Sequence, residues 1–141
     1  MAGRRPDLAI WYDPSAGGMT TSKAYADAAP RWLVERPLLA IRWFRWTWEP
    51  LDPALLARET KLPDDAPGER SEYGLGAAFP HAIAAAKVPA KAIQQTPASD
   101  AMLTEFAMLA VDQLQLGKDA VPDLLAISFG AHDFASMKPG S

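Results

Sequence analysis

The sequence predicts an α/β protein, and three observations support this. A short apolar run followed by a turn near the front is typical of a hairpin. The last third contains one clear amphipathic helix. A continuous apolar run follows that helix after a short linker, as in a buried parallel strand. Helix, tight connection and buried strand together form half of an α/β crossover unit.

The front of the chain reads as a hairpin followed by a short helix. Leu8–Tyr12 is a short strand, Asp13–Gly18 is a strong turn signal, and Met19–Thr21 can pair back onto the strand. Residues 23–29 are then expected to form a short helix, which Pro30 ends.

The middle of the chain is rich in proline, which disfavours helix interiors and central strands. Residues 49–98 are therefore expected to be mostly connections. Leu38–Trp48 is rich in aromatic residues, and its apolar and polar residues partly alternate. We expect its aromatic side chains to pack beneath a long loop. Leu38–Phe44 is a weaker candidate for a strand. The glycines of Gly74–Gly76 indicate a turn, and the alanine-rich stretch 82–87 indicates one or two helical turns.

The last third has the strongest pattern. Thr96–Ser99 carries helix-start chemistry, with proline in the first turn. Apolar residues then recur at helical spacing, and Gly117 suits the position after the helix end. Leu124–Phe129 is the predicted buried strand. The chain is thus expected to form one partial domain with three parts: a hairpin, short helix and aromatic segment (1–48), a Pro-rich connection (49–98), and a helix, strand and metal-type loop (99–141).

Bulk properties exclude several classes of protein. The 141 residues are 49% hydrophobic and 22% charged, which suits one globular domain. The net charge of −3 and the absence of a basic stripe argue against a nucleic-acid partner. No apolar run approaches the roughly 20 residues needed to cross a bilayer. Met1–Asp7 is polar and Leu8–Tyr12 is too short for a signal-peptide core, so no signal peptide is expected in this chain.

Chemistry is expected directly after the predicted strand. In open α/β sheets, ligands bind beyond the carboxyl ends of the strands. Asp133 would lie there and is the main candidate metal ligand, with His132 beside it as a second candidate. Adjacent side chains diverge in an extended segment, and one carboxylate is not a site. A loop Asp and an exposed His remain the alternative interpretation. His81 is more typical of a capping or packing residue than of a ligand.

Read together, these residues resemble the alkaline phosphatase superfamily. The run Pro122–Phe134 (PDLLAISFGAHDF) is similar to the strand and metal loop of its bacterial branch of type I phosphodiesterases and nucleotide pyrophosphatases. That branch typically has P-D-L-L, an apolar strand, S-F-S, two variable residues and D-Y-x-G-H. Further similarities occur in order along the chain, at Trp11–Asp13, Gly17 or Gly18, Thr21–Ser22, Tyr25, Pro30–Trp32, Pro63–Asp65, Phe79–His81 and 105–117.

The resemblance implies a hydrolase of phosphate mono- or diesters that uses two zinc ions and a Thr or Ser nucleophile. Asp133 matches a zinc-binding Asp of the family. Met137 stands where the family has a His ligand and Ser136 where it has Gly, and a thioether is a poor zinc ligand. The nucleophile and the other ligands would lie outside this stretch. No catalytic residue is therefore predicted, and zinc is implied only by resemblance.

The favoured hypothesis is an internal fragment of such a catalytic domain, inactive alone. The alternative is a small non-catalytic binding or self-association module. In either case a homo-oligomer or a complementing chain would cover the exposed strand edges. An active enzyme with Asp133, His132 and His81 as ligands is the least favoured hypothesis. The family is usually periplasmic or secreted, but substrate and compartment stay open.

Overall fold

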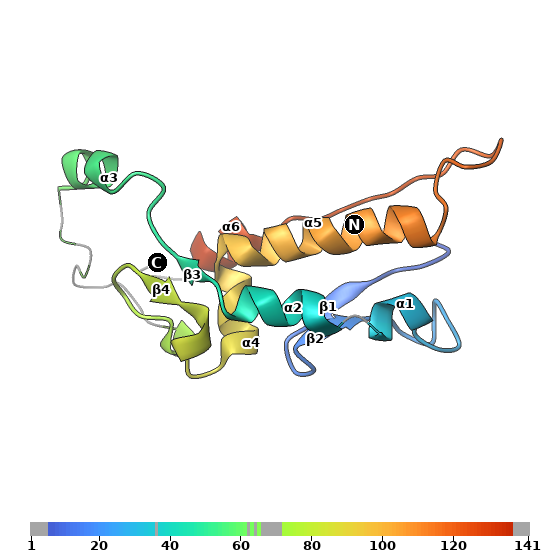
Figure 1. The fold of residues 1–141 in the computed structure, drawn as a ribbon, viewed down its shortest axis with the longest axis horizontal. Helices are drawn as coiled ribbons and strands as arrows, with labels where there is room; N and C mark the ends of the chain where they lie inside the picture. The colour runs from blue at the N-terminus through green and yellow to red at the C-terminus, as the bar shows by residue number, and fades with distance from the viewer. Residues whose placement is uncertain (1–5, 36, 62, 64, 66–71, 137–141) are drawn as a thin grey trace.

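A computed structural model describes residues 6–35, 37–61, 63, 65 and 72–136. The fold combines helices with two small sheets, in agreement with the predicted α/β class (Figure 1). The α-helices are α1 (Arg31–Val34), α2 (Pro37–Phe44), α3 (Pro53–Glu59), α4 (Pro89–Ala92), α5 (Pro97–Gln113) and α6 (Ala131–Ser136). The strands are β1 (Trp11–Asp13), β2 (Gly18–Thr20), β3 (Thr47–Trp48) and β4 (His81–Ala82). The 3₁₀ turns are η1 (Glu72–Gly74), η2 (Ile83–Ala85) and η3 (Ile93–Gln95).

Helix α5 organises the molecule, and the sequence prediction of this helix is confirmed. Proline at its first turn is suited to a helix start because the missing amide would be unpaired there. Four residues spaced four apart are buried on one face: Ala98, Met102, Phe106 and Ala110. Helix α2 and η3 pack against α5, and α5 also contacts α6. Leu33 of α1, Ile83 of η2 and Ile93 of η3 complete the buried core.

The predicted front hairpin is confirmed, with its strands displaced from the predicted bounds. β1 begins at Trp11 and pairs antiparallel with β2, so that Trp11 faces Thr20 and Asp13 faces Gly18. The turn closes through Gly17, whose φ of +68° is readily adopted by glycine and whose amide donates to the Asp13 carbonyl at 2.8 Å. A hydroxyl replaces further ladder bonds: Thr21 Oγ1 donates to the Ala9 carbonyl at 2.7 Å.

Two predictions for the first third are wrong. No helix forms at residues 23–29: a single turn is closed by the Tyr25 and Ala26 amides on the Ser22 carbonyl, and residues 27–29 are irregular. The stretch Leu38–Phe44 lies within helix α2, so its weaker strand assignment is overturned. The prediction that the aromatic segment packs is confirmed, because Trp43, Phe44 and Trp46 contact the buried core.

The Pro-rich middle contains more regular structure than expected. Helix α3 begins where Asp52 accepts the Leu55 amide at 2.9 Å and Pro53 takes the first helical position. None of its residues is buried, and in Figure 1 it stands away from the other elements. β3 and β4 pair antiparallel, with Trp48 opposite His81. In the described parts of the chain, no helix is long and apolar enough to cross a membrane.

Candidate functional site

The segment Leu124–Phe129 is the first component of the candidate site, and its structure differs from the prediction. It is not assigned to a strand, and it is exposed along its whole length, with Leu124 94% exposed. Among the described residues, no hydrogen bond involves the backbone amides or carbonyls of this segment. The prediction of a buried strand is therefore wrong. A buried strand needs neighbours on both sides, and the described sheets contain two strands each.

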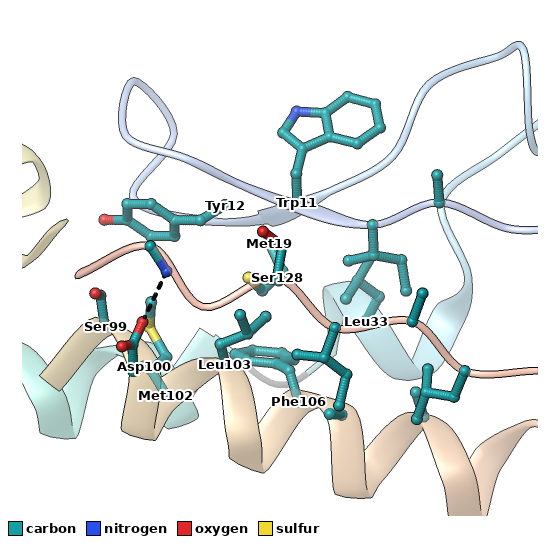
Figure 2. A pocket seen from close by; sticks show the side chains of 18 of the residues that line it. Trp11, Tyr12, Met19, Leu33, Ser99, Asp100, Met102, Leu103, Phe106 and Ser128 are labelled. Carbon is teal, nitrogen blue, oxygen red and sulfur yellow. Dashed lines mark hydrogen bonds between the residues drawn. The ribbon is translucent and has the colours of Figure 1, made fainter. Parts of the chain in front are cut away.

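An apolar groove with a volume of about 640 Å³ lies beside this segment. Figure 2 shows the segment that carries Ser128 between the strand of Trp11 and Tyr12 and helix α5, which carries Met102 and Phe106. The groove is thus bounded by the front of the chain, by α5 and by the extended segment. Most of its lining is apolar, as is usual for sites that bind apolar partners.

Asp100 is the main charged group of the groove, and it holds the end of the extended segment. Its Oδ1 accepts the amides of Gly130 and Ala131, both at 3.2 Å. These amides begin helix α6, where the first turn has unpaired donors. Gly130 has no side chain with which to cap them. The Asp100 carboxylate therefore caps α6 from another helix, and its negative charge lies at the positive end of α6.

The predicted metal ligands lie in α6 and not in a loop. Asp133 is in the first turn of this helix, and His132 precedes it. Their side chains are 75% and 92% exposed, and His132 Nδ1 lies 4.0 Å from Asp133 Oδ1. An exposed pair of this kind contributes little to stability. The metal-type loop of residues 130–134 is thus corrected to a helix whose candidate ligands face solvent.

His81 lies in a different place from the other two candidates. It is buried in β4 between aromatic rings, with its ring centroid 4.4 Å from that of Phe79 and 5.4 Å from that of Trp48. Its Nδ1 is 3.4 Å from the Leu75 carbonyl oxygen. The packing interpretation of His81 is therefore confirmed.

The described residues do not fit a zinc site. Within the ranges that the structure covers, no group of three or more His, Asp or Glu side chains is placed to hold a metal. Zinc in proteins takes three or four protein ligands. Asp133 offers one carboxylate, and Met137, which stands at the family's His position, lies outside the described residues. In the described part of the chain, the candidate site offers Asp133 and, as the weaker candidate, the adjacent His132, which is fewer ligands than a zinc site needs.

The groove also contains a phenol with a perturbed pKa. Burial, and after it the negative charge of Asp13, raise the pKa of the Tyr12 hydroxyl well above its ordinary value of 10.0. The hydroxyl donates to the Ala90 carbonyl at 2.8 Å and ties the hairpin to α4. A hydroxyl that keeps its proton and donates to a carbonyl has a structural role, not that of a nucleophile.

Asp100 is not among the candidate site residues that the sequence indicates; its only visible feature there is a negative charge near the start of the helix, where such a charge is favourable. The structure adds its contact with Gly130 and Ala131. The sequence carried no signal for this contact, because residues 130–134 were expected to form a loop and no helix start was predicted at Gly130.

Comparison with curated proteins shows a distant similarity to an alkaline phosphatase. This relative is alkaline phosphatase PhoV of Synechococcus elongatus, which is 27% identical over 142 residues. The alignment covers 98% of this chain and 26% of PhoV, so the chain spans about a quarter of the length of that relative. No protein-family model and no solved structure matches the chain.

Proposed function

We propose that this chain is part of the catalytic domain of a metal-dependent phosphate mono- or diester hydrolase, and that it does not hydrolyse such esters by itself. One observation carries the proposal: the similarity to alkaline phosphatase PhoV extends over 98% of the chain but over 26% of PhoV. The resemblance of Pro122–Phe134 to a strand and metal loop supports the same assignment, within the type I phosphodiesterase branch.

The inactivity of the isolated chain follows from the chemistry of the reaction. Hydrolysis at two metal ions requires ligands that hold both ions and a nucleophile placed in line with the phosphorus. Each catalytic zinc usually has three protein ligands. Asp133 would contribute one of them. Its exposed side chain could bind a metal ion together with ligands from elsewhere in a larger domain. His132, next to it, is a weaker candidate.

Hydrolysis of an aryl phosphate monoester and an aryl phosphate diester tests the inactivity. Each assay contains the purified chain and added zinc. We expect the chain, Asp133→Ala and the control Asp112→Ala to give the same background rate. Zinc-dependent turnover that Asp133→Ala abolishes and Asp112→Ala preserves would contradict this part of the proposal.

A chimera tests the family assignment separately. In the chimera, this chain replaces the quarter of PhoV with which it aligns. The phosphatase activity of the chimera is compared with that of a PhoV variant from which the same quarter is deleted. We expect low activity that Met137→His increases, because imidazole is a better zinc ligand than a thioether. We expect Asp133→Ala to remove it. A folded chimera whose activity is indifferent to both substitutions would refute the role of Asp133.

A further inference from the structure

We infer that two copies of this chain associate through Leu124–Phe129, pairing as antiparallel strands about a two-fold axis at Ile127. This inference goes beyond the proposed function and does not depend on it. It concerns the chain as an isolated molecule, and it names the partner that covers the exposed segment: a second copy.

The backbone of the segment is the first argument. Six consecutive residues present amides and carbonyls that form no hydrogen bond within the described ranges. Both ends of the segment are held: Asp123 accepts the Gly117 amide at 2.7 Å, and Asp100 accepts the amides of Gly130 and Ala131. An extended segment fixed at both ends loses little further conformational freedom on pairing, so it is a prepared edge for another strand.

The side chains are the second argument. Between Leu124 and Phe129 there is no charge and no proline, two of the devices with which natural edge strands prevent pairing. Leu124, Ile127 and Phe129 are exposed large apolar side chains. An uncharged apolar segment of this length therefore lacks these two defences against pairing with another strand.

The register follows from symmetry. A two-fold axis perpendicular to the plane of the paired strands passes between one residue and its own copy in the partner. Residues at equal distances before and after that residue are then paired, so the numbers of two paired residues have an even sum. An axis at Ile127 places Leu125 opposite Phe129, and Ala126 opposite Ser128. Within Leu125–Phe129, apolar side chains then meet on one face and small ones on the other. Leu124, at the end of the run, lies opposite Gly130.

The charges agree with the same register. With the axis at Ile127, the run Leu125–Phe129 pairs with itself, and Asp123 lies outside the paired run, so that no carboxylate lies within it. An axis at Ala126 would instead place Asp123 opposite Phe129 and Leu124 opposite Ser128. That arrangement sets a carboxylate against an aromatic ring, and it is therefore disfavoured.

Light scattering and sedimentation equilibrium over a wide concentration range test the association. We expect a concentration-dependent dimer. Ile127→Lys should weaken it by about tenfold or more, because the substitution occurs twice at the centre of the interface. Val121→Lys is the matched control, with the same charge change at an exposed apolar residue outside the paired run. A strict monomer, or open-ended assembly insensitive to Ile127→Lys, would overturn the inference. Circular dichroism checks that the helices of each variant persist.

Mixing two variants tests the register itself. Leu125→Lys and Phe129→Glu each weaken their own dimer, but together they place lysine opposite glutamate once and phenylalanine opposite leucine once. We expect the mixture to form a heterodimer with an affinity near that of the unmodified chain. The mixture of Leu125→Lys with Ile127→Glu should form none. Rescue by the second mixture alone would show an axis at Ala126 and refute the register.

Discussion

The Asp100 carboxylate of α5 accepts the Gly130 amide at 3.2 Å and thereby caps a helix that begins about thirty residues later. Capping side chains normally come from the residue just before the helix. Gly130 occupies that position and has no side chain. The position of α6, and with it the exposed position of Asp133, therefore depends on a contact between helices and not on the local sequence.

Asp100→Ala is expected to destabilise the chain by about 1 kcal/mol, the usual cost of losing a helix cap. The loss should be local, because α6 is short and, among the described residues, only Asp100 caps its first turn with a side chain. Urea unfolding gives the change in free energy, and hydrogen exchange at residues 130–134 should become faster. Asp112→Ala is the matched control on the same helix. It removes a negative charge near the C-terminal end of α5 and should be neutral or slightly stabilising. Equal protection of residues 130–134 in both variants would contradict the capping role.

Local patterns in the sequence predicted the elements whose signals are local. Helix α5 has proline in its first turn and an apolar residue every fourth position, and both signals are satisfied within the helix. The hairpin has a turn signal between two short runs, which pair with each other. The stop of α5 was predicted less well. The left-handed residue directly after the C-cap Leu114 is Gln115, with φ +54°, and its side-chain amide donates to the Asp112 carbonyl. Gly117, with φ +72°, is also left-handed but lies two residues further on.

Elements whose state depends on distant partners could not be predicted in the same way. Leu124–Phe129 has the composition of a buried strand, but a buried strand must pair with other strands, and no strand in the described part of the chain pairs with this segment. For the candidate site, the sequence indicated Asp133 and His132 as candidate metal ligands, but it did not predict that both side chains would be exposed to solvent. The contact of Asp100 with Gly130 joins two elements whose relative placement no spacing pattern encodes.

Two methionines on α5 provide a matched test of the core. Met102 is 1% exposed and belongs to the buried cluster, whereas Met108 is 64% exposed. Met102→Ala should reduce the free energy of unfolding by about 2–5 kcal/mol, because the removed atoms leave a cavity in the core. Met108→Ala should change it by less than about 0.5 kcal/mol. Urea denaturation measures both. Similar losses for the two variants would show that this face of α5 is not the core.

Two glycines with positive φ separate backbone strain from steric overlap. Gly117 has φ +72°, and a β-carbon added there would meet open space, so Gly117→Ala should cost about 1–2 kcal/mol from strain alone. Gly74 has φ +75°, and a β-carbon there would lie 2.8 Å from the Lys87 amide nitrogen. Gly74→Ala should therefore be clearly more destabilising than Gly117→Ala. Thermal or urea unfolding ranks the two, with Gly18→Ala as a control that has neither feature. The reverse ranking would refute the close approach at Lys87.

Tyr12 predicts how stability depends on pH in the alkaline range. Its pKa is raised in the folded chain by burial and by Asp13, so the folded state holds the phenolic proton more tightly than the unfolded state. The sign follows by linkage: this contribution is fully present below the ordinary pKa of 10.0 and is lost as the pH rises above it.

Tyr12→Phe should remove that dependence, and it should also lose the hydrogen bond to the Ala90 carbonyl. At neutral pH we expect a loss of about 0.5–1.5 kcal/mol. The difference between the two proteins should shrink as the pH rises above 10.0, because only the unmodified chain is destabilised by ionisation of this phenol. Urea unfolding at a series of pH values measures both effects. Tyr25→Phe, at an exposed ring, is the control for hydroxyl removal at neutral pH. A constant difference across the alkaline range would show that burial does not hold the Tyr12 proton.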